Sequence, residues 1–239
     1  MNRTHLLYSA KNALVATLLI SMLGVFSFFA FEPSVGRSAS GDSRNFTVTQ
    51  QITNEISFLV DPGNVTMVGS IAGLTGGYAT GTTVTSVRTN NATGYNMTLH
   101  FATNSRPHAM VASSTDPSSA YIANYTNTGG AGIPDDNWAD NASGASAEFG
   151  YSVNASTSAE VAQAFKNNGA SCNQSAGSPS ADHCWLNPTT TPQTIINSTL
   201  PSDSSTTTLK FKVAVPSSPS PALPSGYYTA TGTLTIFTN

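Results

Sequence analysis

The strongest constraint on the fold is a strict alternation of apolar and polar side chains in several short segments. In residues 208–215 (TLKFKVAV) the side chains of Leu209, Phe211, Val213 and Val215 alternate with those of Lys210 and Lys212. Successive side chains of a β-strand point to opposite faces, so a period of two predicts a strand with one buried face. We therefore expect the apolar side chains of this segment inside the protein and both lysines in solvent.

Similar segments recur along most of the chain after residue 45, separated by residues that favour turns. We expect further strands at 46–53 (FTVTQQIT), 55–60, 64–74, 76–81, 82–89, 95–101, 107–112, 147–153 and 226–238. In residues 95–101 (YNMTLHF) the odd-numbered side chains should be buried and the even-numbered ones exposed. The pattern predicts an all-β fold, a single antiparallel β-sandwich of the immunoglobulin-like or jelly-roll-like kind.

One short helix is expected within residues 157–169 (TSAEVAQAFKNNG). Thr157 and Glu160 have the spacing of a capping box, in which each side chain bonds to the backbone of the other residue. Asn167, Asn168 and Gly169 then supply a C-terminal cap. A helix is therefore predicted between strands, just before the first cysteine.

The N-terminal residues 1–40 carry an export pattern. Arg3 and Lys11 precede an uninterrupted apolar run at residues 13–31, and Ser38-Ala39-Ser40 offers a cleavage site of small residues before Gly41. At a rise of about 1.5 Å per residue, the run could also just cross a hydrocarbon core of about 30 Å as an uncleaved hydrophobic helix. We therefore expect residues 1–40 to be a signal peptide or an N-terminal membrane anchor, and residues 41–239 to form the exported domain.

The exported part is weakly acidic. It has six basic and eleven acidic side chains, a net charge of −5, which favours neither nucleic acid nor an anionic lipid surface as a partner. Its two cysteines, Cys172 and Cys184, are close in sequence, and in an exported protein such a pair predicts a disulfide. A zinc site that uses His183 is the weaker alternative, because no second cluster of ligands accompanies the pair.

Motifs of catalysis are missing. The sequence has no G-x-S-x-G elbow, no H-E-x-x-H, no P-loop and no G-x-G-x-x-G. Most of its acidic residues are scattered, and nothing suggests two carboxylates that converge on one substrate. We therefore expect that the protein is not an enzyme.

Acidic and amide side chains do concentrate in residues 133–144 (IPDDNWADNASG). Asp135, Asp136, Asn137 and Asp140 lie close together, and calcium binds such oxygen ligands in flexible loops. The spacing is not that of an EF-hand, and a turn rich in Asn and Asp is the simpler interpretation. Calcium is the one cofactor that the sequence suggests.

Trp138 and Trp185 lie in expected loops, where exposed aromatic rings could stack on sugars. Aromatic rings in β-sandwiches serve more often as parts of the core, and Trp185 follows Cys184 and could pack on the disulfide. Glycan stacking by these two residues is therefore the second candidate site.

Several of the segments together resemble a family of exported surface proteins from Gram-positive and candidate-phylum bacteria. They are "TSVRTNNATGYNMTLHF", "EFGYSV" and "LKFKVAV", leading to "LPSGYYTATGTLTIFTN". The chain is also distantly similar to WxL-type cell-wall-binding domains, with Tyr95 in place of the first tryptophan and "TLTI" in place of the second motif. The closing strand, with Gly226 near its start, is similar to those of fimbrial subunits that assemble by donor strands.

The resemblance and the residues together imply a non-enzymatic, secreted or cell-surface protein of the bacterial envelope, structural or adhesive. Two alternatives remain open: a pilus or fibre subunit that assembles by strand complementation, and a module that binds cell wall or glycans. The expected partners are the envelope or other surface proteins, with glycans under the last alternative. Membrane contact is expected only through residues 13–31, if these are not cleaved.

Overall fold

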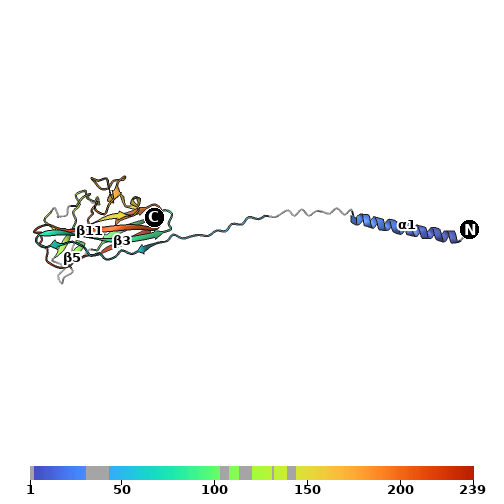
Figure 1. Ribbon diagram of the computed structural model, residues 1–239, viewed down its shortest axis with the longest axis horizontal. Coiled ribbons are helices and arrows are strands. Elements are labelled where there is room, and N and C mark those ends of the chain that lie inside the picture. The colour runs from blue at the N-terminus through green and yellow to red at the C-terminus, as the bar shows by residue number, and fades with distance from the viewer. Residues whose placement is uncertain (1–2, 31–42, 103–107, 113–119, 131, 139–143) are drawn as a thin grey trace. The chain divides into compact units, whose positions relative to one another are not determined.

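The computed structural model describes residues 3–30, 43–102, 108–112, 120–130, 132–138 and 144–239, which form two compact units, Met1–Gln51 and Ile52–Asn239. In the first unit α1 (Arg3–Ala30) is a single helix, and residues 43–51 have no regular secondary structure (Figure 1). Within the part of the chain whose side chains are described, no helix combines the length and the apolar character needed to cross a membrane.

The second unit is built of strands, which confirms the all-β prediction. These are β1 (Ile56–Val60), β2 (Ile71–Ala72), β3 (Gly76–Thr89), β4 (Tyr95–Phe101), β5 (Met110–Ala112), β6 (Tyr121–Asn124), β7 (Glu148–Ala155), β8 (Lys166–Asn167), β9 (Ser178–Pro179), β10 (Gln193–Ser198), β11 (Ser202–Val215), β12 (Tyr228–Ala230) and β13 (Gly232–Thr238).

The strands form two main sheets. The larger has the order β1-β3-β11-β7-β6-β5-β12, with β2 paired to β3, and the smaller has the order β10-β4-β13. A separate small pair joins β8 and β9. All pairings within the described residues are antiparallel except that of β6 with β7, which is parallel and departs from the purely antiparallel prediction.

The two main sheets contribute side chains to one hydrophobic core. Tyr95 and Met97 on β4 are fully buried and Leu99 and Phe101 are 3% exposed, as the alternation predicts. From the larger sheet, Phe149 packs edge-on against Phe101, with ring centroids 5.8 Å apart. The even-numbered side chains of β4 are less exposed than expected, because β10 and β13 flank this strand on both sides.

Residues 157–169 do not form the predicted helix. Instead, η1 (Ser158–Glu160) and η2 (Gln163–Phe165) are two single 3-10 turns, and Thr157 makes no side-chain capping bond. Glu160 accepts hydrogen bonds from Ser198 and Ser205 on neighbouring strands rather than from its own helix terminus. Contacts with β10 and β11 therefore override the local capping signal.

The predicted strand at 46–53 is also absent. Residues 43–55 are exposed and carry no assigned structure. An alternating segment becomes a strand only when its backbone groups find a partner, and among the described residues this segment has none in either sheet.

Candidate functional site

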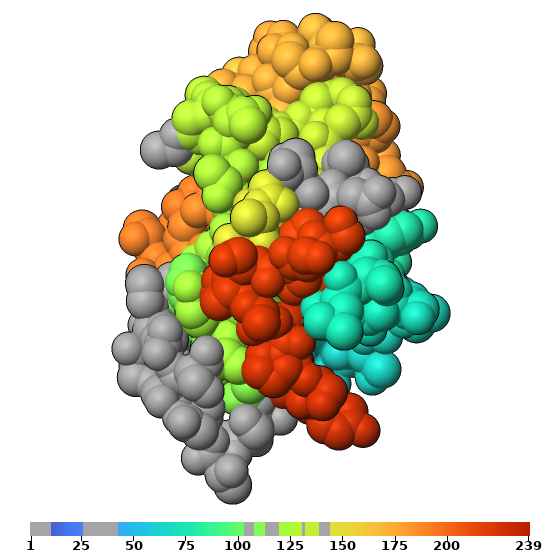
Figure 2. Space-filling view, turned by 90° about the vertical axis from the view of Figure 1, so that its left-hand side faces the viewer, coloured from blue at the N-terminus to red at the C-terminus, as the bar shows by residue number. Residues whose placement is uncertain are grey.

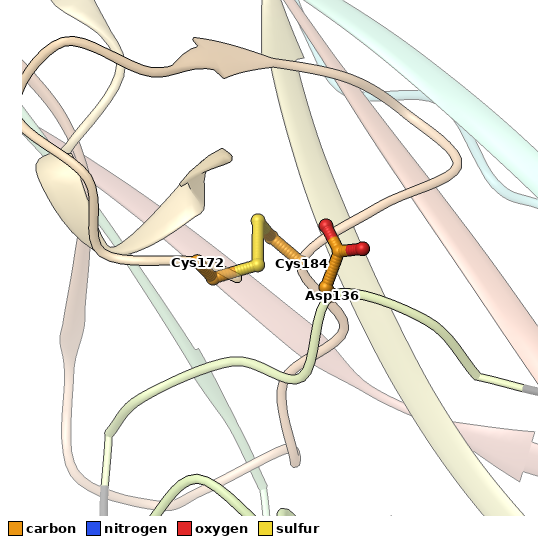
Figure 3. A group of neighbouring side chains, drawn as sticks. All are labelled: Asp136, Cys172 and Cys184. Atoms are coloured by element: carbon orange, nitrogen blue, oxygen red, sulfur yellow. A yellow bond between two sulfur atoms is a disulfide. The ribbon is translucent and has the colours of Figure 1, made fainter. Parts of the chain in front are cut away.

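The cysteine prediction is confirmed: Cys172 and Cys184 form a disulfide, with an S–S distance of 2.03 Å. The Asp136 carboxylate lies beside it (Figure 3), and one of its oxygens lies within 4.8 Å of both sulfur atoms. Zinc binds cysteine as a thiolate, and neither sulfur of a disulfide is one. This cluster is therefore a covalent crosslink with an acidic neighbour, not a metal site.

His183 completes the surroundings of Asp136. Its Nδ1 lies 3.3 Å from Asp136 Oδ1, and their side chains are 35% and 7% exposed. The geometry of this contact is not that of a hydrogen bond, since both atoms lack a hydrogen-bond partner. The other carboxylate oxygen, Oδ2, accepts a hydrogen bond of 3.1 Å from Asn137 Nδ2. The pair is thus a close polar contact against the disulfide.

Asp135 points to a different neighbourhood. It pairs with Trp185 in an isolated β-bridge, so its side chain and that of Asp136 lie on opposite faces of an extended segment. The Asp135 carboxylate accepts hydrogen bonds from Tyr125 Oη at 2.7 Å, from Thr128 Oγ1 at 2.8 Å and from the backbone amide of Gly129 at 2.9 Å. It thereby anchors residues 125–129.

These hydrogen bonds lower the pKa of Asp135 and so favour its ionised form. Burial by itself raises the pKa of this carboxyl, but the hydrogen bonds from Thr128, Tyr125 and Gly129 outweigh burial and leave the pKa below its ordinary value. The oxygens that a calcium ion would need already accept donors from the protein. Asp135 and Asp136 do not converge, and Asp140 lies outside the described residues, so the described geometry favours the Asx-rich turn over a calcium site.

Trp138 and Trp185 enclose a lysine. They are 8% and 3% exposed, so the expectation of exposed rings for glycan stacking is wrong. Lys212 Nζ lies 5.3 Å from the ring centroid of Trp138, 5.6 Å from that of Trp185 and 5.4 Å from that of Tyr78. It also donates a hydrogen bond of 2.7 Å to the Trp138 carbonyl oxygen.

The prediction that Lys212 is exposed is wrong as well, since only 4% of the residue is accessible. Residues 133–138 and the segment after the disulfide cover this end of β11 and bring their indole rings over the ammonium group. No local signal distinguishes Lys212 from Lys210, and only the long-range packing reveals the aromatic enclosure.

A pocket of about 580 Å³ lies beside this enclosure and is lined in part by Tyr125, Trp138, Asp135 and Glu148. Burial raises the pKa of Glu148, whose Oε1 accepts a hydrogen bond of 3.3 Å from the Thr126 amide. Both carboxylates in the pocket therefore hold the backbone of residues 126–129 in place. The hydroxyl groups of Thr128 and Tyr125, which also line the pocket, donate hydrogen bonds to the Asp135 carboxylate.

A second opening, of about 450 Å³, lies between the two sheets. Its inner wall is apolar and includes Leu99, Phe101, Phe149 and Phe211, and its rim is formed by residues 62–67 and 228–234. No side chain with a formal charge at neutral pH lines it. Sequence reasoning missed this opening, because it arises between strands that are distant from one another in the chain.

Comparison with known proteins adds no relative to this description. No protein-family model matches the chain, and no curated protein matches it significantly.

Proposed function

We propose that the chain is a non-enzymatic, exported protein of the cell envelope or cell surface, with a structural or adhesive role. The proposal rests on the observation that the candidate catalytic and binding groups are already engaged in contacts within the fold. Asp135 accepts hydrogen bonds from residues 125–129, Trp138 and Trp185 enclose Lys212, and both cysteines are consumed in the disulfide.

The disulfide supports the location in this proposal. A crosslink between residues 172 and 184 persists in oxidising compartments and is rare in the bacterial cytosol. The export pattern of residues 1–40 and the net charge of −5 after residue 40 agree with a protein that works outside the cell. Glycan stacking on Trp138 and Trp185 is not part of the proposal, because both rings are buried.

The test is fractionation of cells that express the full chain, followed by N-terminal sequencing of the recovered protein. We expect the protein outside the cytoplasm, with the Cys172–Cys184 crosslink oxidised as isolated. A first residue of Gly41 means a cleaved signal, and retention of residues 1–40 means an anchor. Recovery in the cytoplasm with reduced cysteines would overturn the proposal.

A second candidate function, subunit of a fibre that grows by strand exchange, is favoured by a different observation. The chain carries an exposed, alternating segment before β1 and an apolar opening between its sheets. Exchange of a strand between copies is a recognised mode of assembly at sheet edges.

A further inference from the structure

The smaller sheet ends at an unpaired edge. β13 pairs with β4 from Gly232↔Phe101 to Thr238↔Tyr95, and among the described residues no strand pairs with its other side. Because Thr231 and Asn239 exchange backbone hydrogen bonds with residues of the β4 side, the antiparallel pattern turns the backbone groups of Gly232, Leu234 and Ile236 away from β4. β1 of the larger sheet lies against part of β13 without pairing with it, so the part of this row that β1 leaves open is the template for another strand.

The 450 Å³ pocket lies at the start of the same strand. Gly232 and Leu234 of β13 line it together with residues 228–230 of β12 and residues 62–65, which follow β1. β1 is itself the edge strand of the larger sheet. Figure 2 shows these two parts of the chain side by side, the C-terminal residues in red and the residues after β1 in teal. The opening is therefore flanked by edge strands of both sheets.

The chain also contains a segment with the properties of a missing strand. Residues 46–52 (FTVTQQI) alternate, carry no charge and remain outside regular structure. Phe46, Val48 and Ile52 are 87%, 82% and 79% exposed, although they are large and apolar. As a strand the segment would span about 23 Å at about 3.3 Å per residue, which is enough to reach from the pocket along the part of β13 that β1 leaves open.

We propose that residues 46–52 of a second copy of this chain add a strand along the free edge of β13, with Phe46 and Val48 inserted into the pocket. The backbone of the added strand bonds to the free groups of β13, and its alternate apolar side chains cover Phe101 and Phe211 at the inner wall. This inference rests on the fibre-subunit candidate function and names its docking site and its partner.

Contacts of residues 53–55 within the β-domain oppose a reversal of the chain that would bring its own segment to this site. Residues 43–55 contain no turn, and the Thr53 carbonyl oxygen and the Glu55 amide are bonded to the Asn90 side chain at 3.0 and 2.7 Å. A reversal of the chain between residue 52 and β1 would have to break these contacts. An uncharged pocket and an uncharged segment also make a second copy a better match than a charged peptide.

The decisive experiment is a disulfide crosslink between two full-length chains of different tag length. The two native cysteines are bonded to each other and the sequence has no others, so introduced cysteines report only on the new contact. A chain with Val48→Cys is mixed with one that carries Leu234→Cys, and the register is scanned with Ile236→Cys. We expect a mixed dimer on non-reducing gels, with about tenfold less of it when Thr49→Cys replaces Val48→Cys, because Thr49 would point away from the pocket.

A second measurement addresses assembly without crosslinks. The double variant Phe46→Asp/Val48→Asp should lose multimers in size exclusion with light scattering, since burial of a charge in an apolar pocket is costly. The matched control, Thr47→Asp/Thr49→Asp, places the same charges on the solvent face and should keep its multimers. Circular dichroism of all variants checks that the fold is retained.

Three outcomes overturn the inference. They are a mixed dimer that is no more abundant with Val48→Cys than with Thr49→Cys, multimers that survive the Phe46→Asp/Val48→Asp change, and a chain that is monomeric outside the cell. A monomeric chain outside the cell would contradict the docking of residues 46–52 but not the proposed envelope location. Recovery of the protein in the cytoplasm would contradict the location but not docking between copies of the purified protein.

Discussion

At the scale of single residues, Lys212 is the clearest case of a side chain whose role follows from its surroundings. Burial removes the Lys212 ammonium group from water, which costs free energy unless other interactions replace its hydration. Part of the replacement comes from three aromatic rings and one carbonyl oxygen, those of Tyr78, Trp138 and Trp185 and of the Trp138 backbone. The lysine thereby ties β11 to the segment before β7 and to the segment after the disulfide.

Replacement of Lys212 by methionine should therefore lower the free energy of unfolding by about 1–3 kcal/mol, because a cation–π contact and a charged hydrogen bond are lost while the length is kept. Lys210→Met is the matched control, since its side chain is 21% exposed and forms a surface ion pair with Asp182. That change should cost less than about 1 kcal/mol. Urea unfolding measures both, and equal losses would contradict the enclosure as a source of stability.

The hydrogen bonds to Asp135 lead to a prediction about how the stability of the fold depends on pH. The pKa of Asp135 is lower in the folded protein than its ordinary value of 3.8. The ionised carboxylate therefore contributes its full stabilisation of the fold above pH 3.8, and this contribution is lost as the pH falls through the lowered pKa of the folded protein. The difference in unfolding free energy between the native protein and Asp135→Asn should be constant from pH 7 to about 5 and should shrink towards pH 3.

Urea unfolding at a series of pH values measures the Asp135 effect, with Asp203→Asn, an exposed carboxylate, as the control. A difference that stays constant or widens towards pH 3 would show that the hydrogen bonds to Asp135 do not set its pKa.

At the scale of elements, the turn between β3 and β4 holds the end of the C-terminal strand. Asn91 is 3% exposed and its Nδ2 donates to the carbonyl oxygens of Gly94 at 2.7 Å and of Asn239 at 3.2 Å. Gly94 has a φ of +83°, and a Cβ there would lie 2.1 Å from the Ser198 carbonyl oxygen. Glycine is therefore required both by the backbone conformation and by the close approach of the end of β10.

Gly94→Ala should lower the free energy of unfolding by about 2–4 kcal/mol, because strain at positive φ and a backbone clash add together. Gly130→Ala is a matched control, since Gly130 has a φ of +102° but open space around its Cβ position. Its cost should be that of the backbone conformation alone, about 1–2 kcal/mol. Thermal or urea unfolding compares the stabilities of the two variants. Equal losses of stability would mean that the turn between β3 and β4 shifts to relieve the contact with the added Cβ.

The disulfide is the other element that can be tested directly. A crosslink with a sequence separation of 12 is expected to stabilise by about 3 kcal/mol through the unfolded chain. The double variant Cys172→Ser/Cys184→Ser should lose about that much, and addition of reductant to the unmodified protein should lower its stability to the same level. An unchanged unfolding midpoint under reductant would show that the loop is held by its other contacts.

At the scale of the whole molecule, the division at residues 51 and 52 separates the N-terminal residues from the β-domain. All residues of the main hydrophobic core come from residue 56 onward. The β-domain therefore has what it needs to fold without the preceding segment.

Removal of residues 1–44 should leave the unfolding midpoint of the β-domain unchanged to within about 1 °C in dilute solution. Differential scanning calorimetry of the full and shortened chains measures this. A large loss of stability would mean that the first 44 residues contribute to the core, in conflict with the division of the chain into two units.

Much of the fold follows from the sequence, for reasons visible at particular residues. The alternation at residues 95–101 and 208–215 places Tyr95, Met97, Leu209 and Val213 in the core as predicted, because side-chain direction in a strand is a local property. The spacing of Cys172 and Cys184 likewise predicts their bond. The candidate sites were predicted less well, because exposure of Trp138 and convergence of Asp135 with Asp136 depend on distant segments.

The sequence by itself therefore determined the class of fold, the faces of the main strands and the crosslink, since each depends on periodicity or on proximity along the chain. Only the tertiary structure decided that Lys212 is enclosed by aromatic rings and that residues 158–160 and 163–165 form single 3-10 turns. It also decided that residues 46–53 have no strand partner among the described residues. These outcomes depend on pairing and packing between residues far apart in the chain, and a local pattern carries no information about which partner is present.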